Sequence, residues 1–342
     1  MPSLAETYDV ALLDLDGVVY VGAYAVEHAT AALANARAGG MRLAFVTNNA
    51  ARPPQAVADQ LTGLGIPATS AEVVTSAHAA ARVLADMLPR GARVLVVGGE
   101  GLVDALRERA LTPVGDAAAG PAAVVQGFHP DVGWRLLAEG SYAVATGVPW
   151  VASNADRTIP TPRGTAPGNG TLVDAVRAAT SREPIVAGKP EPPMHREAVL
   201  RTNARRPLVV GDRLDTDIEG ARRSDVDSLL VLSGVTTPEQ LVHAKPMQRP
   251  TYVAEDLRAL AEPAQGLTVR PGLVQCGGFS AAVEDGRVVL RRSVSPGGGA
   301  RLDGLRAVCG ATWAAEDRAE RVVDVETALA EAGWISDTPD GP

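Results

Sequence analysis

Cysteine is scarce in this sequence: Cys276 and Cys309 are the only two in 342 residues, and both lie near the C-terminus. Neither belongs to a Cys-x-x-Cys pair or to a His-rich cluster. A disulfide framework and a zinc site are therefore not expected, and a reducing cytoplasm fits this cysteine usage.

Aromatic residues and positive net charge are also lacking. Aromatics make up 4% of the chain, so its core must be built mainly from alanine, valine and leucine. The net charge of −8 argues against nucleic acid and anionic membranes as partners. An anionic substrate would consequently have to be held by a few local cations.

Long apolar runs are missing as well. No run reaches the length of a membrane span, and residues 1–6 show neither the basic start nor the apolar stretch of a signal peptide. The content of 46% hydrophobic and 21% charged residues is typical of a soluble globular protein. The length allows two or three domains.

The apolar run Val10–Leu13 ends in two closely spaced carboxylates, Asp14 and Asp16, followed by Gly17. Such a run is typical of a buried strand in a parallel sheet. Residues i and i+2 of a strand share a face, so both carboxylates should emerge at the carboxyl end of the strand, where α/β sheets bind ligands. The pair indicates a divalent metal, a nucleophile beside an acid, or an ordinary Asp-Gly turn.

The rest of the chain alternates between strand and helix patterns. After the first strand, a helix is expected at 25–38, a strand at 42–46 and a second helix at 53–64. This order predicts an α/β fold with a doubly wound parallel sheet and right-handed crossovers. A further strand is expected at 207–210, just before a second acidic loop.

The pattern also predicts an inserted domain. We expect residues 1–70 and 185–264 to form the core, and residues 71–184 to form an α/β cap between its two parts. Within the cap, strands are expected at several places, including 93–97 and 142–145.

Residues 265–342 are expected to form a small α+β domain. An Asp-Gly turn between two alternating runs is a hairpin signal there. The expected elements are a linker at 263–272, hairpin strands at 279–283 and 287–292, a glycine-rich loop at 295–299, and helices at 302–313 and 325–332.

Three predicted strand ends and one loop carry residues suited to phosphate chemistry. We interpret Asp14 as a nucleophile that would form an aspartyl-phosphate, and Asp16 as the acid that protonates the leaving oxygen and then activates water. Thr47 offers a hydroxyl group, and Lys189 a compact positive charge for the transferring oxygens. Asp212 completes a set of oxygen ligands for magnesium.

These residues lie in four ordered motifs: Asp14-Leu-Asp16-Gly-Val, Thr47-Asn48-Asn49, Gly-Lys189-Pro and Gly211-Asp212-Arg-Leu-Asp-Thr-Asp217. In this order they resemble the haloacid dehalogenase-like phosphatases over about residues 5–262. An insertion between the second and third motifs is the class II cap arrangement. The motifs look like those of the 4-nitrophenyl-phosphatase-like branch of that family.

The resemblance implies an enzyme that depends on magnesium. It implies that the ion is held by the Asp14 carboxylate, the Asp16 backbone carbonyl and the Asp212 carboxylate. Asp217 would support the water shell of the metal, and the alternative is that it caps the helix that follows it.

The resemblance also assigns the phosphate and substrate contacts. Thr47, Asn48 and Lys189 would hold the phosphate, with Asn49 as a weaker candidate. Asp156 and Arg157 lie in a cap loop that faces the leaving group in relatives, and either could instead be an ordinary surface residue. The branch often pairs through cap edges, which makes a homodimer possible.

The substrate implied is a small phosphorylated metabolite. Glycerol 3-phosphate is expected first, with phosphoglycolate or a sugar phosphate as the nearest rival. Residues 273–342 resemble a small acetyltransferase-like domain, with a loop at 296–301 similar to an acyl-CoA pyrophosphate loop. We expect this domain to be structural or regulatory.

Other readings stay open on the sequence. A hydrolytic dehalogenase would use Asp14 but would need neither Asp16 as an acid nor a metal-binding Asp212. A phosphometabolite sensor would bind without turnover, and residues 273–342 could bind acetyl-CoA.

Overall fold

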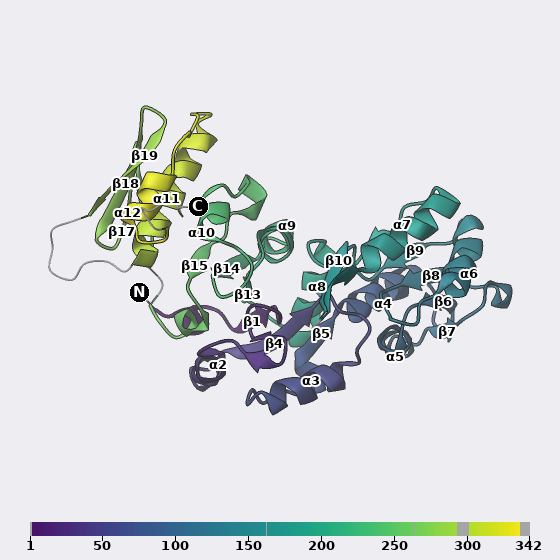
Figure 1. The fold of residues 1–342 in the computed structure, drawn as a ribbon. Helices are drawn as coiled ribbons and strands as arrows, with labels where there is room; N and C mark the ends of the chain where they lie inside the picture. The colour runs from purple at the N-terminus through teal and green to yellow at the C-terminus, as the bar shows by residue number, and fades with distance from the viewer. Residues whose placement is uncertain (1, 162, 264, 293–300, 336–342) are drawn as a thin grey trace.

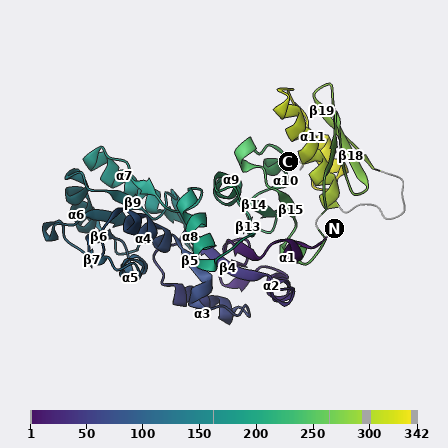
Figure 2. The same ribbon diagram turned by 180° about the vertical axis from the view of Figure 1, so that it is seen from behind.

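The computed structural model describes residues 2–161, 163–263, 265–292 and 301–335. The expected glycine-rich loop at 295–299 lies outside these residues. Three sheets with their helices follow one another in space, and the core sheet lies between the other two (Figures 1 and 2). In the described ranges, no helix combines the length and apolar composition needed to cross a membrane.

The core is a six-stranded parallel sheet in the order β15-β14-β13-β1-β4-β5. Its strands are β1 (Val10–Leu13), β4 (Arg42–Thr47), β5 (Val73–Thr75), β13 (Pro207–Gly211), β14 (Asp227–Val231) and β15 (Tyr252–Ala254). Crossovers on both faces join the strands, so the α/β, doubly wound fold predicted from the sequence is confirmed.

Helices cover both faces of the core sheet. They are α1 (Leu4–Thr7), α2 (Ala29–Ala38), α3 (Pro54–Gly63), α4 (Ser76–Met87), α8 (Pro192–Thr202), α9 (Glu219–Arg223) and α10 (Pro238–Val242). A short hairpin of β2 (Tyr20–Val21) and β3 (Tyr24–Ala25) precedes α2, which therefore begins later than expected. Alternate side chains of each buried strand enter opposite layers.

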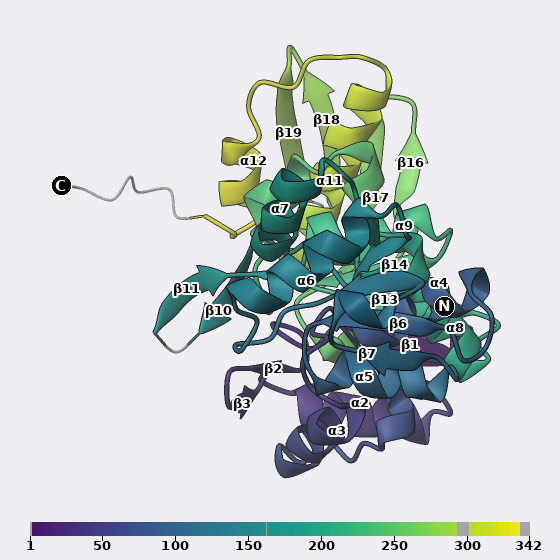
Figure 3. The ribbon, with the colours of Figure 1, turned by 90° about the vertical axis from the view of Figure 1, so that its right-hand side faces the viewer.

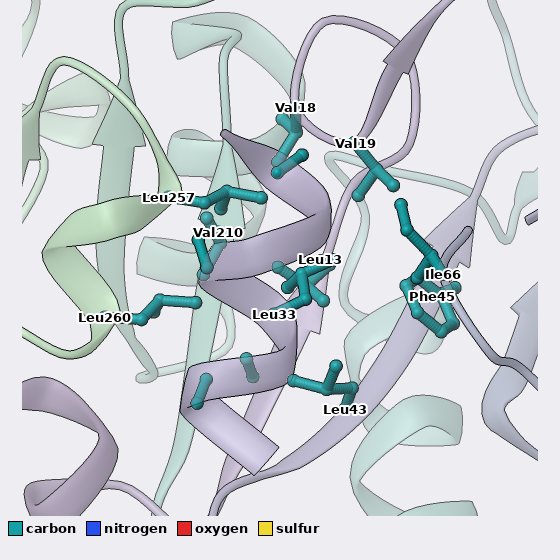
Figure 4. Packing of buried hydrophobic residues seen from close by; sticks show 14 of the residues in the cluster. Leu13, Val18, Val19, Leu33, Leu43, Phe45, Ile66, Val210, Leu257 and Leu260 are labelled. Atoms are coloured by element: carbon teal, nitrogen blue, oxygen red, sulfur yellow. The ribbon is translucent and has the colours of Figure 1, made fainter. Parts of the chain in front are cut away.

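One of these layers is seen in Figure 4. Leu13 of β1, Phe45 of β4 and Val210 of β13 point to the same face and pack with Leu33 of α2. Leu260, from the 3₁₀ turn Leu257–Leu260, closes the layer. Because aromatics are few, this packing relies on branched aliphatic side chains, as the composition predicts.

The inserted segment forms a five-stranded parallel sheet in the order β12-β9-β8-β6-β7. The elements are β6 (Arg93–Val97), α5 (Glu100–Glu108), β7 (Thr112–Val114), β8 (Ala123–Gln126), α6 (Trp134–Ala145), β9 (Trp150–Ala152), α7 (Asn169–Thr180) and β12 (Ile185–Val186). A hairpin of β10 (Thr158–Thr161) and β11 (Gly164–Pro167) extends from this domain (Figure 3).

The prediction of a strand at 142–145 is wrong, because these residues form the end of helix α6. Gly140, Ala143 and Val144 are its buried residues, at helical spacing. A short apolar run does not distinguish a buried strand from a buried helical turn.

Strand pairing locates the passages between the two sheets. β5 pairs with β4, so the core sheet extends past residue 70, and β12 pairs with β9, so the cap sheet extends past residue 184. Helix α4 packs between the sheets, and its Ala80 and Leu84 share one apolar cluster with Val46 and Val74 of the core and Val96 of the cap.

A buried charge cluster joins helices α4 and α8 and the end of α5. The carboxylate of Glu197 on α8 is fully buried and accepts from the guanidinium groups of Arg82 on α4, at 3.0 Å, and Arg201, at 2.6 Å. Arg109, at the end of α5, is its third ion-pair partner. Three elements of the junction therefore meet on one carboxylate.

The C-terminal domain is a four-stranded antiparallel sheet, in the order β16-β17-β18-β19, packed on two helices. The elements are β16 (Thr268–Arg270), β17 (Leu273–Cys276), β18 (Phe279–Glu284), β19 (Arg287–Arg292), α11 (Arg301–Asp317) and α12 (Glu326–Glu331). The hairpin prediction is confirmed: Asp285 and Gly286 both have positive φ, as a type I′ turn requires.

The linker expected at 263–272 is only partly correct, because it contains strand β16. All three residues of β16 are exposed, and the strand lies at the edge of the sheet. An exposed edge strand carries no apolar alternation, which explains why the sequence did not indicate it.

Candidate active site

Three neighbouring strands of the core sheet bring the predicted residues together. The order β13-β1-β4 places Asp14, which follows β1, between Asp212, which follows β13, and Thr47, which ends β4. All three strands are parallel, so their carboxyl ends share one edge of the sheet. The strand-end reasoning therefore predicts this convergence correctly.

Lys189 lies at the centre of the site. Its ammonium Nζ is 2.5 Å from Asp14 Oδ1 and 2.7 Å from Asp217 Oδ1, and the side chain is almost completely buried. Burial would lower the pKa of this ammonium, but the two carboxylates outweigh burial and raise the pKa. Lys189 is consequently a fixed positive charge between two acids.

The acids form a compact group. One carboxylate oxygen from each of Asp14, Asp212 and Asp217 lies within 4.8 Å of the others. One ammonium cannot neutralise three carboxylates, so the group keeps a negative charge that a divalent cation would balance. Among the described residues none donates to the buried Oδ1 of Asp212, which leaves that atom available as a ligand. The donor set fits a hard, oxygen-binding ion such as magnesium.

Burial and mutual repulsion raise the pKa values of two of these acids, Asp14 and Asp212. Burial raises the pKa of Asp14 to about 7, with Asp217 adding to the rise and Lys189 opposing it. Burial and the carboxylate of Asp217 raise the pKa of Asp212 to about 6. Both effects arise because the ionised form lacks water, and a bound cation would act in the opposite direction.

Two glycines make room for Asp212. A Cβ atom on Gly17, where φ is +82°, would lie 2.5 Å from Asp212 Oδ2, and one on Gly234 would lie 2.0 Å from the same oxygen. That oxygen accepts from the backbone N–H of Val235 at 2.7 Å. Neither position can carry a side chain without displacing the carboxylate.

Asp16 lies apart from this acidic group. Its side chain is exposed, and its carboxylate is not part of the three-acid group found among the described residues. Partial shielding from water raises its pKa, while the nearby charges of Lys189 and Arg52 oppose the rise. Because Asp16 is exposed yet close enough to Lys189 to be influenced by its charge, its carboxylate can exchange protons with a substrate.

Asn48 connects the core to a cap loop. Its Oδ1 accepts from the backbone N–H of Lys189 at 2.8 Å, and its Nδ2 donates to the backbone carbonyl of Lys189 at 3.1 Å. The same amide donates to both carboxylate oxygens of Asp156 at 3.3 Å. Burial raises the pKa of Asp156. The cap residue Asp156 is thereby brought to the edge of the site.

The other predicted contact residues bind to neighbouring groups of the protein; they are Thr47, Asn49 and Arg157. The hydroxyl of buried Thr47 accepts from the backbone N–H of Asn49 at 3.1 Å. The side chain of Asn49 is turned to the N–H of Ala51 at 2.9 Å. The ion-pair partner of Arg157 is Asp174 of α7, rather than an acid of the site.

Sequence reasoning missed several residues around the site. Ser233 donates to the carbonyl of Gly17 at 2.8 Å, and Thr236 donates to the carbonyl of Asp212 at 2.6 Å. Arg213, which chelates Asp215 at 2.9 and 3.1 Å, also acts electrostatically on Asp156. Arg213 lies inside the fourth motif, whereas Ser233 and Thr236 follow the end of β14, and only these positions could have indicated them.

Three protein-family models match parts of the chain. A haloacid dehalogenase-like hydrolase family model matches residues 11–112, and a HAD-hydrolase-like model matches residues 186–260. A GCN5-related N-acetyltransferase-like model matches residues 276–334.

Relatives agree with these matches. The D-glycerol 3-phosphate phosphatase of Mycobacterium tuberculosis is 44% identical over 319 residues, which cover 92% of this chain and 88% of that protein. The 5′-nucleotidase YutF of Bacillus subtilis is 36% identical over 254 residues, 74% of this chain and 97% of its own.

Solved structures agree as well. A glycerol phosphate phosphatase from Mycobacterium tuberculosis, in complex with magnesium, superposes with a TM-score of 0.88 at 42% identity, covering 98% of this chain and 99% of that one. A p-nitrophenyl phosphatase from Archaeoglobus fulgidus superposes with a TM-score of 0.68 at 28% identity, covering 74% of this chain and 98% of that one.

The family models and the relatives show that this chain, whose parallel sheet brings carboxylates around a buried lysine, is a hydrolase. The chain belongs to the haloacid dehalogenase-like hydrolases, which confirms the resemblance that its four motifs indicated. Its C-terminal region is acetyltransferase-like, as was also expected.

Proposed function

We propose that the chain is a magnesium-dependent phosphomonoester hydrolase that acts through an aspartyl-phosphate on Asp14. The observation that carries the proposal is the 2.5 Å contact between Lys189 Nζ and Asp14 Oδ1, inside a group of three acids with an unpartnered Asp212 oxygen. Such a site can bring an anionic phosphate and a carboxylate nucleophile together, because its cations offset their repulsion.

The chemistry takes two steps. A carboxylate oxygen of Asp14 bonds to phosphorus while the bond from phosphorus to the substrate oxygen breaks, and Asp16 gives that leaving oxygen a proton. Asp16 then takes a proton from water, whose oxygen attacks phosphorus and releases inorganic phosphate and free Asp14. The raised pKa of Asp16 suits it to both transfers.

Magnesium would be held by the carboxylates of Asp14 and Asp212, with the Asp16 backbone carbonyl as a further ligand and Asp217 in support. It would neutralise charge on the phosphate oxygens. Asp217 also fixes Lys189, because its Oδ1 accepts from the ammonium at 2.7 Å. Lys189 in turn stabilises the transferring oxygens.

Phosphate would be held by Thr47, Asn48 and Lys189, with Asn49 able to contribute only if its side chain leaves Ala51. Asp156 would face the leaving group, since Asn48 holds it beside Lys189. Arg157 would need to release Asp174 before it could contact a substrate.

We propose glycerol 3-phosphate as the substrate. The support is 44% identity, over most of both chains, to a D-glycerol 3-phosphate phosphatase. A sugar phosphate is the second candidate, because acid sugar phosphatases such as that of Staphylococcus saprophyticus are 35% identical over 254 residues. Phosphoglycolate is the third candidate.

The proposed domain limits are core residues 1–70 and 185–264, cap residues 71–184 and C-terminal residues 265–342, except that β5 (Val73–Thr75) belongs to the core sheet and β12 (Ile185–Val186) to the cap sheet. We also propose a cytoplasmic location, no nucleic-acid partner and a homodimer formed through the cap. Light scattering of the purified chain would test the dimer, and a monomer at working concentrations would contradict it.

The function is tested by phosphate release from glycerol 3-phosphate, phosphoglycolate, sugar phosphates and nucleotides. Each assay is run with MgCl2, with chelator and with Asp14→Ala, and the exposed Asp104→Ala of α5 serves as the control. We expect turnover that requires both magnesium and Asp14 and is fastest on glycerol 3-phosphate. Phosphate release that survives chelator would contradict the magnesium requirement, and binding without turnover would favour a sensor.

A further inference from the structure

The loop after β14 encloses Asp212. Val235 donates its backbone N–H to Asp212 Oδ2 at 2.7 Å, and Thr236 donates its hydroxyl to the Asp212 carbonyl at 2.6 Å. The backbone N–H of Thr236 also donates to that carbonyl, at 3.2 Å. The position of the Asp212 carboxylate is therefore set largely by residues 233–236.

This loop continues directly into α10 (Pro238–Val242). Thr237 begins the helix through a capping box with Gln240, so loop and helix are one hydrogen-bonded unit. The helix has five residues and is about 7.5 Å long. A displacement of its far end would consequently reach the loop with little attenuation.

The far end of α10 is held by the C-terminal domain. Trp313 of α11 donates its indole N–H to the carbonyl of Val242 at 3.0 Å. Arg249 donates to the carbonyl of Ala244 at 3.1 Å, and its guanidinium lies 5.6 Å from the centre of the Trp313 ring. Two carbonyls at the end of the helix are thus satisfied by this pair.

Arg249 is itself fixed to α11. It donates to Glu316 at 2.7 Å and to Asp317 at 2.6 Å. Leu241 and Val242 of α10 share an apolar cluster with Leu305 and Val308 of α11. The two helices lie side by side in both ribbon views (Figures 1 and 2).

We propose that the acetyltransferase-like domain holds the Asp212 carboxylate in its metal-binding position through α10, with Trp313 as the positioning residue. The inference rests on the proposed role of Asp212 as a magnesium ligand. Under this proposal, the C-terminal domain contributes to catalysis through its contact with α10. Loosening the contact of Trp313 with Val242 would weaken magnesium binding at a site in a different domain.

Trp334 provides a matched control. Its indole N–H donates to the carbonyl of Arg301 at 2.9 Å, and the Arg301 guanidinium lies 4.2 Å from the ring centre. The contact has the same chemistry as that of Trp313 but stays within the C-terminal domain. Trp334→Phe and Trp313→Phe each remove one indole hydrogen bond and keep an aromatic ring.

The test measures MgCl2 binding to the full-length, substrate-free protein by titration calorimetry. We expect Trp313→Phe to weaken magnesium binding by about three- to tenfold, the range that corresponds to one lost hydrogen bond, and Trp334→Phe to leave it unchanged. Amide hydrogen exchange should accelerate at Val235 and Thr236 in Trp313→Phe only. Thermal midpoints of the two metal-free variants separate this effect from a general loss of stability.

Equal magnesium affinity and equal exchange in the two variants would overturn the inference. Failure of the wild-type protein to bind magnesium would instead overturn the proposed function, so the two failures are distinguishable. If Trp313→Phe does not fold, Glu316→Gln combined with Asp317→Asn frees Arg249 from α11 and tests the same link.

Discussion

Asn48 and Lys189 are joined by two hydrogen bonds. The side-chain Oδ1 of Asn48 accepts from the backbone N–H of Lys189 at 2.8 Å, and its Nδ2 donates to the backbone carbonyl of Lys189 at 3.1 Å. The pair fixes the loop that carries the ammonium. It also brings Asp156 to the site, because the same amide donates to that carboxylate.

Replacing Asn48 should therefore damage catalysis more than replacing its neighbour. We expect Asn48→Ala to lower kcat/KM by about ten- to a hundredfold, because it leaves backbone groups of Lys189 and the carboxylate of Asp156 unpaired. Asn49→Ala, which removes only the contact with Ala51, should stay within about threefold of wild type. Steady-state kinetics on glycerol 3-phosphate make the comparison, and equal losses would contradict this account of Asn48.

Gly234 should not accept a side chain. A Cβ there would lie 2.0 Å from Asp212 Oδ2, so Gly234→Ala must displace the carboxylate. We expect magnesium binding to weaken by about tenfold or more, comparable to the loss of a well-placed metal contact. Gly133→Ala is the control, since nothing lies within 4 Å of a Cβ at that position. Calorimetric titration with MgCl2 gives the answer, and unchanged affinity in Gly234→Ala would show that Asp212 is not a ligand.

Magnesium binding should depend on pH near neutrality. Ligands must be ionised to bind, and burial raises the pKa of Asp14 to about 7 and that of Asp212 to about 6. Protons therefore compete with the ion increasingly as pH falls through this window. We expect about tenfold weaker binding at about pH 6 than at about pH 8, with proton release on binding at the lower pH. A flat profile would indicate that neither carboxylate binds the ion.

The stability of the metal-free protein should also depend on pH, because buried groups titrate at shifted pKa values. The folded-state pKa of Asp14 exceeds its ordinary value, so the folded state binds more protons between about pH 4 and 7, and this contribution to stability falls as pH rises. The pKa of His78 is lowered to about 4 by burial, which gives the opposite slope. Thermal midpoints of wild type and Asp14→Asn across this range isolate the Asp14 contribution as their difference.

Glu197 should be the costliest single charge to remove. Glu197→Ala leaves three guanidinium groups at a junction where their partner was fully buried, so we expect a loss of about 3–5 kcal/mol in the free energy of unfolding. Glu100→Ala, which breaks an exposed pair with Arg107, should cost less than about 1 kcal/mol. Urea unfolding followed by circular dichroism measures both, and similar midpoints would contradict the role of the junction.

The sequence predicted the residues whose position follows from strand ends. Thr47 ends a strand, and Asp14 and Asp212 each directly follow one, so parallel pairing of neighbouring strands is sufficient to bring them together. Asn48 followed from motif resemblance. Lys189 was included because of its company with the strand-end residues, since nothing local indicates that a loop lysine will reach Asp14.

The remaining features depend on tertiary contacts that leave no local pattern. Asp217 reaches Lys189 because residues 214–218 form a wide π-turn, which no spacing rule indicates. Arg157 pairs with Asp174 through the packing of α7, and the buried cluster around Glu197 combines three separate helices. The sequence identifies the chemical type of a polar side chain, but the residue that it contacts depends on the tertiary structure.

The central place of β1 in the core sheet has a consequence for synthesis of the chain. One neighbour, β4, emerges soon after it, but the other, β13, follows only after on the order of two hundred residues. At ~5–20 residues per second the ribosome takes about 10–40 s to supply that strand. Throughout this delay the apolar edge of Val10–Leu13 has no partner on that side, while the contiguous cap can already fold. Lys189, Asp212 and Asp217 follow the cap in the chain, so no nascent chain can turn over substrate before the cap and β13 have been synthesised.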